Sequence, residues 1–323
     1  MASRLMDIDK LRAIAALSVL YFHATNTVLN YPTNELIRTS GAFGHLGVDV
    51  FFVISGFIIP LFMWRANFVF TQHWKTFIAK RIVRIEPSCI ASIAFTILLG
   101  YIVNAYYDKV LYQYTIYQLL SHLFYLNIIL GYDWVNPVYW TLAIEFQFYI
   151  FLLFVYHSIV NKKFRWLAYM CILTSAHYLN NSVFIFKFLP IFFVGISAFL
   201  YHTQLIKLFE YIGLVIISCI FAATSVGFIS VLVGLITAHA ILFINLPNSK
   251  FLVMLGSISY STYLFQYPIV EKIVRFGKVL GYTVYSQLFI VTLSIIDSIF
   301  ISYIMYVLVE RPSMCVAAKF KYK

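Results

Sequence analysis

An apolar segment near the N-terminus, residues 11–24, reads LRAIAALSVLYFHA and carries Arg12 near its start and His23 near its end. The rest of the chain is similarly apolar, because 62% of its 323 residues are hydrophobic and only 11% are charged. A water-soluble globule of this length cannot bury so much apolar surface. The sequence therefore predicts an all-α membrane protein in which this segment belongs to the first transmembrane helix.

Transmembrane helices are expected wherever about 20 mostly apolar residues follow one another, since that length spans about 30 Å of hydrocarbon. A further apolar stretch, residues 117–130, is shorter and predicts a re-entrant or interfacial helix. We therefore predict a polytopic transmembrane helical bundle that forms one integral-membrane domain, residues 1–323. Its approximately ten predicted spans cover residues 8–29, 44–64, 87–107, 137–160, 166–178, 183–201, 209–224, 226–246, 251–271 and 285–310.

The basic residues favour a cytoplasmic location for both termini. Most of the 23 Lys and Arg residues fall in segments that a cytoplasmic N-terminus places on the inner side, as the positive-inside rule requires. The net charge of +11 then reflects short loops that face anionic membrane lipids, so no nucleic-acid partner is expected. The four cysteines are isolated, which indicates neither a disulfide framework nor a metal site.

The spacing of Arg12 and His23 places both side chains on one face of the first helix. Their separation of 23 − 12 = 11 residues, at about 100° per residue, makes three turns plus roughly 20°, with a rise of about 16 Å. An arginine at the cytoplasmic boundary then puts the histidine near mid-bilayer, where ionisable groups normally face a protein-lined cavity. The pair predicts a polar shaft. The alternative is an anchoring arginine and a histidine that bonds a neighbouring helix.

The second predicted span carries a carboxylate. Residues 44–60 read GHLGVDVFFVISGFIIP, with Asp49 among apolar residues. An aspartate there needs a partner, and one that bonds an imidazole nitrogen leaves the other nitrogen free as a general base. We therefore predict that Asp49 orients His23; the alternative is an Asp49 held by the backbone or by His45. The glycines of this segment permit close helix approach and are Gly44, Gly47 and Gly56.

Two arginines lie at the cytoplasmic face in KRIVRIEP, residues 80–87. Arg81 and Arg84 are three residues apart, so a helix presents them on one face, and guanidinium groups suit phosphates because their planar forks donate paired bonds. Together with Arg12 they predict a phosphate-binding site on the order of 15 Å from His23. Coenzyme A fits this distance, with phosphates at one end and a thioester at the other. The alternative is that these arginines are topology signals only.

Six motifs extend this interpretation over nearly the whole chain. They read, in order, DIDKLRAIAALSVLYFHA, GVDVFFVISGFII, RIVRIEP, WTLAIEFQFY, SISYSTYLFQYP and VERP. In this order they resemble the motifs of the acyltransferase-3 family, bacterial integral membrane proteins that commonly O-acetylate surface glycans. The chain departs from the family pattern at Phe146, where a second glutamate usually follows Glu145, and at Gln266, where a histidine is often found. The single-glutamate motif is similar to that of members linked to exopolysaccharide modification.

The resemblance implies an acyl-CoA donor, acetyl-CoA in the simplest case, that enters from the cytoplasm. It implies that Arg12, Arg81 and Arg84 lie near the donor and that His23 and Asp49 lie near the transfer centre. The implied acceptor is a hydroxyl of a cell-surface or exported glycan, and the implied location is a bacterial inner membrane. Some relatives finish the transfer with a fused hydrolase-like domain, which is not expected here, so either this chain transfers the acyl group directly or a separate periplasmic or extracellular partner completes the transfer.

The expected reaction begins when His23 removes the proton of the acceptor hydroxyl, which then attacks the thioester. A covalent acyl-histidine intermediate is the alternative. The developing oxyanion needs hydrogen-bond donors such as Tyr263, Ser259 or Trp140. Glu145 is expected to contact the acceptor or to pair with a buried arginine.

Two functions without acyl transfer remain as alternatives. Basic residues along a shaft would also suit a transporter or channel for a small anion, although the chain lacks the paired Gly- or Pro-interrupted segments that mark inverted repeats. The other alternative is a polysaccharide-export or scaffold subunit. Cleavage of the thioester of labelled acetyl-CoA separates an acyltransferase from both.

Overall fold

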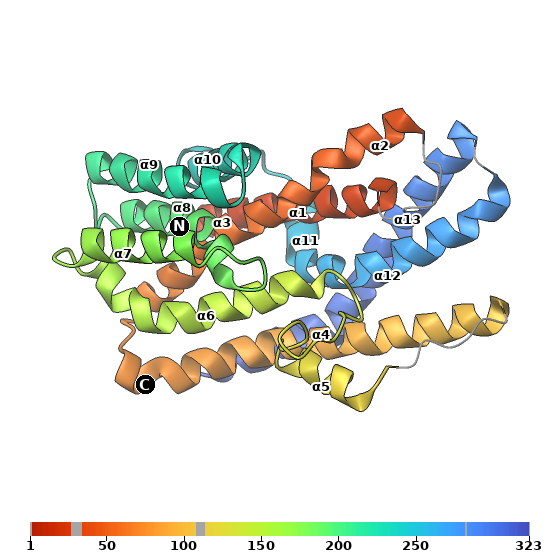
Figure 1. Ribbon diagram of the computed structural model, residues 1–323, viewed down its shortest axis with the longest axis horizontal. Coiled ribbons are helices and arrows are strands. Elements are labelled where there is room, and N and C mark those ends of the chain that lie inside the picture. The colour runs from red at the N-terminus through yellow and green to blue at the C-terminus, as the bar shows by residue number, and fades with distance from the viewer. Residues whose placement is uncertain (1, 27–33, 108–113, 282, 323) are drawn as a thin grey trace.

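The computed structural model describes residues 2–26, 34–107, 114–281 and 283–322, and all secondary-structure elements in these residues are helical (Figure 1). The predicted all-α class is therefore confirmed. The 3-10 turns are η1 (Ala42–Leu46), η2 (Ile185–Lys187) and η3 (Lys278–Leu280), and η4 (Tyr306–Glu310) is a π-helical turn. The α-helices are α1 (Ala2–Asn26), α2 (Glu35–Gly41), α3 (Gly47–Arg65), α4 (Phe70–Tyr107), α5 (Ile116–Leu123), α6 (Tyr139–Val160), α7 (Arg165–Tyr178), α8 (Leu189–His202), α9 (Leu208–Ser225), α10 (Phe228–Phe243), α11 (Lys250–Ser257), α12 (Ser259–Gly277), α13 (Val284–Met305) and α14 (Arg311–Lys319).

Each of the ten predicted spans contains helix, which supports a membrane protein with several crossings. α8 and α10 are apolar but shorter than a usual span. The number of ten spans stays a prediction, and the end of the first predicted span, residues 27–29, lies outside the described residues. In the described part of the chain, five segments are long and apolar enough to cross a membrane: Glu35–Arg65, Phe70–Val103, Tyr139–Val160, Leu208–Ser225 and Val284–Lys319.

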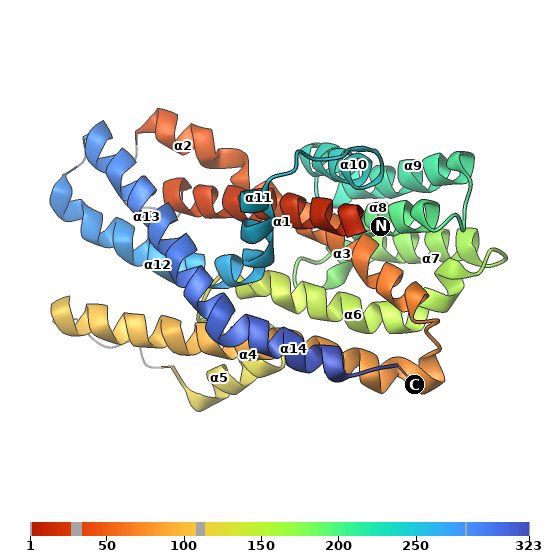
Figure 2. The same cartoon turned by 180° about the vertical axis from the view of Figure 1, so that it is seen from behind.

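Most of the long helices run along the long axis of the molecule, and α11 crosses between them (Figures 1 and 2). α1 begins and α14 ends in the same half of the molecule (Figure 2). This arrangement agrees with an even number of crossings. The cytoplasmic location of both ends stays a prediction.

The boundary between α9 and α10 lies at Gly227. Its φ angle of +98° is one that glycine adopts without the steric cost that a side chain would add. The Gly227 N–H donates to the Ala222 carbonyl oxygen at 3.3 Å, and α10 begins at the next residue. The break predicted near Ser225 is therefore confirmed. The short helix expected within residues 117–130 is present as α5.

α4 is longer than the sequence predicted. It begins at Phe70, and Pro87 lies inside it, so the predicted start at Pro87 is wrong. Proline suits the first turn of a helix because it has no N–H to satisfy there, which explains the prediction. In a membrane bundle, however, neighbouring groups compensate for the missing donor. As a result, one continuous helix carries both Arg81 and Arg84.

Close packing through glycine brings α3 against α1 and α8. A Cβ atom at Gly56 would collide with the backbone carbonyl oxygen of Phe192 in α8, and one at Gly195 would collide with that of Val53 in α3. The two earlier glycines of this region approach the α1 backbone in the same way. Small residues at such contacts let helices approach closely in membranes. The prediction of close approach is therefore confirmed for Gly44, Gly47 and Gly56.

Candidate active site

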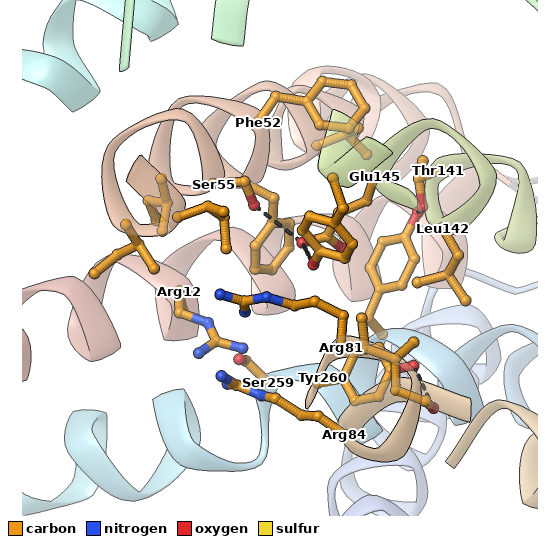
Figure 3. A pocket seen from close by; sticks show the side chains of 18 of the residues that line it. Arg12, Phe52, Ser55, Arg81, Arg84, Thr141, Leu142, Glu145, Ser259 and Tyr260 are labelled. Atoms are coloured by element: carbon orange, nitrogen blue, oxygen red, sulfur yellow. Dashed lines mark hydrogen bonds between the residues drawn. The ribbon is translucent and has the colours of Figure 1, made fainter. Parts of the chain in front are cut away.

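A narrow cavity lies where α1, α3, α4, α6, α12 and the turn η4 meet. Its volume is about 200 Å³. Along α3 its lining runs from Val48 to Phe62, a separation of 62 − 48 = 14 residues that corresponds to a rise of about 21 Å. Figure 3 shows the polar side chains that face it. The long and narrow shape suits an extended ligand.

Three guanidinium groups share this cavity. Arg12 comes from α1, and Arg81 and Arg84 come from one face of α4; Figure 3 shows the three groups directed into the same space. None of them forms an ion pair with a carboxylate among the described residues. The Nε atom of Arg81 is buried without an acceptor in the same part of the chain. Like charges repel more strongly in the protein interior than in water. This arrangement therefore favours an anionic ligand.

Aromatic rings hold Arg81 in place. Its guanidinium carbon lies 5.4 Å from the ring centroid of Phe77 and 5.2 Å from that of Tyr149, distances at which cation–π attraction operates. The contacts fix the guanidinium carbon, while the Nε–H group has no acceptor among the described residues and is available to a ligand. The Tyr149 hydroxyl also donates to Oε1 of Glu145 at 2.5 Å, and Ser55 donates to the same oxygen at 3.1 Å.

The turn η4 contributes a second carboxylate to the cavity lining, that of Glu310. Its Oε2 atom accepts two hydrogen bonds from Ser261, one from the backbone N–H at 3.1 Å and one from the hydroxyl at 2.5 Å. Glu310 is 3% exposed, and it interacts electrostatically with Arg12 and Arg84. Single π-helical turns occur often at functional sites. Two carboxylates and three guanidinium groups line the cavity, and Asp9, outside the lining, interacts electrostatically with Arg12 and Arg84.

A hydrogen bond joins two residues of the cavity lining that come from different helices. Thr141 of α6 donates to the hydroxyl oxygen of Tyr263 of α12 at 2.7 Å, and both side chains are buried. Ser259 also lines the cavity, and its hydroxyl has no hydrogen-bond partner in the described chain. These residues surround the cavity with hydroxyl groups that can bind an oxygen of a ligand.

Comparison with known proteins supplies the family. A family model described as "Acyltransferase domain", that of acyltransferase-3, matches residues 6–307. The chain belongs to the acyltransferase-3 family. This membership supports acyl transfer as the activity and, together with the apolar helices, a membrane location.

Two further proteins resemble this acyltransferase-3 chain. "Putative acetyltransferase ORF330" of Acidianus two-tailed virus is 28% identical over 306 residues, which cover 86% of this chain and 87% of that protein. "Regulator of hypoxia-inducible factor 1" of Caenorhabditis elegans is 46% identical over 44 residues, or 13% of this chain and 9% of that protein. No solved structure matches the chain significantly.

His23 and Asp49 lie outside the lining of the cavity in this acyltransferase-3 chain. The His23 ring packs edge-on against Tyr267, with centroids 5.3 Å apart, one helical turn beyond Tyr263. The Asp49 carboxylate lies near Ser230 of α10 and interacts electrostatically with His45. The two side chains form no ion pair within the described residues.

The packing of α1 on α3 explains this separation. Gly44 meets the backbone of Ser18 and Gly47 that of Ala15, so the two helices are antiparallel and Asp49 lies near the level of Ala13, about ten residues from His23 and therefore on the order of 15 Å along the axis. Arg12 and His23 thus lie at different positions along the α1 axis, and the cavity reaches Arg12 but not His23. Trp140 also lies outside the lining, where its ring packs against Phe188 at 5.4 Å.

The remaining predicted residues line the cavity together, although they are far apart in the sequence: Arg12, Arg81, Arg84, Glu145, Ser259 and Tyr263. The sequence did not single out five further polar residues of the lining. Three of them lie inside motifs that resemble those of the family, so the motifs were the available signal for Ser55, Tyr149 and Glu310. Thr141 and Tyr260 also lie in such motifs, but hydroxyl groups in apolar helices are common enough to give no separate signal.

Proposed function

We propose that this chain is a membrane O-acyltransferase that moves an acyl group, acetyl in the simplest case, from cytoplasmic acyl-CoA to a hydroxyl of a cell-surface or exported glycan. The observation that carries the proposal is the group of three arginines without ion-pair partners in a narrow cavity of an acyltransferase-3 chain. We place the protein in the inner membrane of a bacterium, and an exopolysaccharide is the proposed class of glycan.

In this proposal the donor lies along the cavity. Its phosphates bind Arg12, Arg81 and Arg84, because guanidinium groups form paired, charge-assisted hydrogen bonds with phosphate oxygens. The pantetheine arm then extends along the α3 side of the cavity toward Thr141 and Tyr263. The rise of about 21 Å along this side accommodates such an arm. No metal takes part.

The proposed reaction transfers one proton and one acyl group. His23 takes the proton of the acceptor hydroxyl as its oxygen bonds to the thioester carbon, and the negative charge on the carbonyl oxygen is stabilised by donors such as Ser259 and Tyr263. The carbon–sulfur bond then breaks, and the CoA thiolate takes the proton from His23. Tyr263 lines the cavity, and Tyr267, which contacts His23, lies one helical turn further along α12, so in this proposal the Thr141–Tyr263 hydrogen bond opens during transfer.

Other predicted residues have supporting parts in this proposal. Asp49 lies at a distance from His23 and near Ser230 of α10, so in this proposal it supports the packing of α3 on α10. Glu145, fixed by Ser55 and Tyr149, contacts the acceptor or faces the arginines. Trp140 supports the cavity wall from behind. Either the chain delivers the acyl group directly to the glycan, or a separate periplasmic or extracellular partner completes the transfer.

The test uses the purified full chain in detergent or liposomes with radiolabelled acetyl-CoA and an exopolysaccharide acceptor. We expect free CoA and label on the glycan, released by mild alkali as expected for an O-ester. Label that accumulates inside liposomes without thioester cleavage would instead establish a transporter. Absence of both thioester cleavage and transport would leave only a scaffold or export subunit and end the proposal.

Replacement of Arg84 with Gln should raise KM for acetyl-CoA by roughly 10- to 150-fold, as expected for the loss of one charge-assisted hydrogen bond to a phosphate. Arg84 is the best choice because Arg81 also packs against aromatic rings. The matched control is Arg38→Gln, since Arg38 is exposed and pairs only with Glu35 in the described chain. Steady-state kinetics at equal membrane abundance measure both; an unchanged KM for the Arg84 variant contradicts a phosphate contact.

A further inference from the structure

The cavity is too small for a whole acyl-CoA molecule. Its volume of about 200 Å³ lies below the roughly 300–1,000 Å³ of pockets that enclose drug-sized ligands, and acyl-CoA is larger than most such ligands. If the proposed function is correct, the pantetheine arm and the nearest phosphates fill the cavity. The nucleotide end of the donor must then lie outside it.

The cavity meets the protein surface at Phe62. This side chain lines the cavity and is 37% exposed. Arg65 follows three residues later at the end of α3, and residues three apart share a helix face, so Arg65 continues the Phe62 side of α3 outward. Its Nε atom is buried and has no acceptor among the described residues. An unused cationic donor therefore lies next to the opening.

The C-terminal tail reaches the same place. After α14 the chain brings Tyr322 against Phe68 in the turn that joins α3 to α4, with ring centroids 6.5 Å apart. The backbone N–H of Phe68 donates to the carbonyl oxygen of Met63 at 3.0 Å, so this turn folds back onto the last turn of α3. Tyr322 therefore lies beside the end of α3 that carries Phe62 and Arg65, and Figure 2 shows the C-terminal end of the chain near the turn between α3 and α4.

A lysine completes this group. The Nζ atom of Lys80 lies 5.0 Å from the ring centroid of Tyr322, and Lys80 directly precedes Arg81 of the cavity. An aromatic ring with cations near it suits a purine nucleotide, because the ring stacks on the base and the cations bind its phosphates. The same residues at the edge of a bilayer would also serve as membrane anchors, and the two roles predict different results.

We propose that Arg65, Lys80 and Tyr322 form the site for the nucleotide end of the acyl donor. The proposal rests on the proposed function, which supplies the donor. It adds a binding role for the C-terminal tail, since Tyr322 lies beyond residues 6–307 that match the family model. The site divides the donor between the arginine cavity, which holds the arm and its diphosphate, and the tail, which holds the base and the remaining phosphate.

The experiment compares acetyl-CoA with acetyl-pantetheine, which has the same thioester but no nucleotide. Tyr322→Ala should raise KM for acetyl-CoA by roughly 5- to 150-fold, the range for loss of one base–aromatic stack, and leave KM for acetyl-pantetheine within about twofold. Tyr322→Phe should behave as the unaltered chain because it keeps the ring. Lys80→Gln should act in the same direction as Tyr322→Ala.

Matched controls come from similar residues elsewhere. Tyr285→Ala removes a tyrosine that is 86% exposed at the start of α13, and Lys163→Gln removes a lysine whose Nζ lies 5.7 Å from the Phe164 ring. Both should leave KM for acetyl-CoA unchanged. Equal effects of Tyr322→Ala on the two donors, or no effect on either, would overturn the proposal.

Binding measurements separate this proposal from the proposed function. Calorimetry with the solubilised full chain gives Kd for CoA and for pantetheine without any transfer step. We expect Tyr322→Ala to weaken CoA binding and to leave pantetheine binding unchanged. If the unaltered chain binds CoA in this way but transfers nothing, the proposed function fails and the nucleotide site stands. If the Tyr322 variant binds CoA as the unaltered chain does, the nucleotide site fails.

Discussion

Replacement of His23 with Ala is expected to lower kcat for acyl transfer by about 10²- to 10⁴-fold, the usual contribution of a general base. KM for acyl-CoA should change little, because His23 is not among the residues that line the cavity. The variant should still fold, since the contact with Tyr267 is an edge-on ring contact rather than part of the main core. The measurement is steady-state transfer at equal membrane abundance.

The matched control for His23 is His177→Ala. His177 is exposed at the end of α7 and contacts Tyr178, Phe221 and Thr224, so its loss should leave kcat unchanged. A His23 variant with ordinary kcat would remove the histidine from the proposed reaction. Rapid-quench experiments then distinguish direct attack from a covalent route, because only an acyl-histidine enzyme releases a burst of CoA without acceptor.

The second large effect concerns the fold. Gly195→Ala should destabilise the protein by about 1–3 kcal/mol, the usual cost of an overpacked contact, because the new Cβ atom would collide with the Val53 backbone oxygen. Backbone cannot move aside as a flexible side chain does, so α3 and α8 must separate. The double variant Gly56→Ala/Gly195→Ala should lose more unfolding free energy than Gly195→Ala alone. The Cβ atom at position 56 would make a separate collision, with the Phe192 backbone of α8.

Thermal unfolding of the solubilised protein measures this effect, with Gly100→Ala as control. A Cβ atom at Gly100, also inside a helix, would meet no atom within 4 Å. Its replacement should leave Tm unchanged or raise it, because alanine favours helix over glycine by up to about 1 kcal/mol. If Gly195→Ala and Gly100→Ala unfolded at the same temperature, the glycine contact between α3 and α8 would not limit stability.

Sequence reasoning predicted most helices and the arginine site because both depend on local patterns. Apolar runs mark helices, and Arg81 and Arg84 share a face through their spacing alone. The levels of His23 and Asp49 could not be predicted in this way. They depend on where α3 rests against α1, which the contact of Gly47 with Ala15 determines, and no periodicity in either helix reveals that register.

Glu310 shows a second limit of sequence reasoning. Its position in the cavity depends on the π-helical turn η4 and on hydrogen bonds from Ser261, which lies 310 − 261 = 49 residues earlier. The motif VERP identified the residue but not its neighbours. Likewise, the start of α4 was misplaced because Pro87 is equally compatible with a first helical turn and with the interior of a packed bundle.

The hydrogen bond between Thr141 and Tyr263 has a consequence for unproductive hydrolysis of the acyl donor. Both side chains are buried, so a thioester bound beside them in the proposed reaction is shielded from bulk solvent on that side, and its spontaneous hydrolysis should be slow while no acceptor is present. The thioester carbon would then become accessible only when the sugar binds. Thr141→Val removes the hydrogen bond, so this variant should hydrolyse acetyl-CoA in the absence of an acceptor.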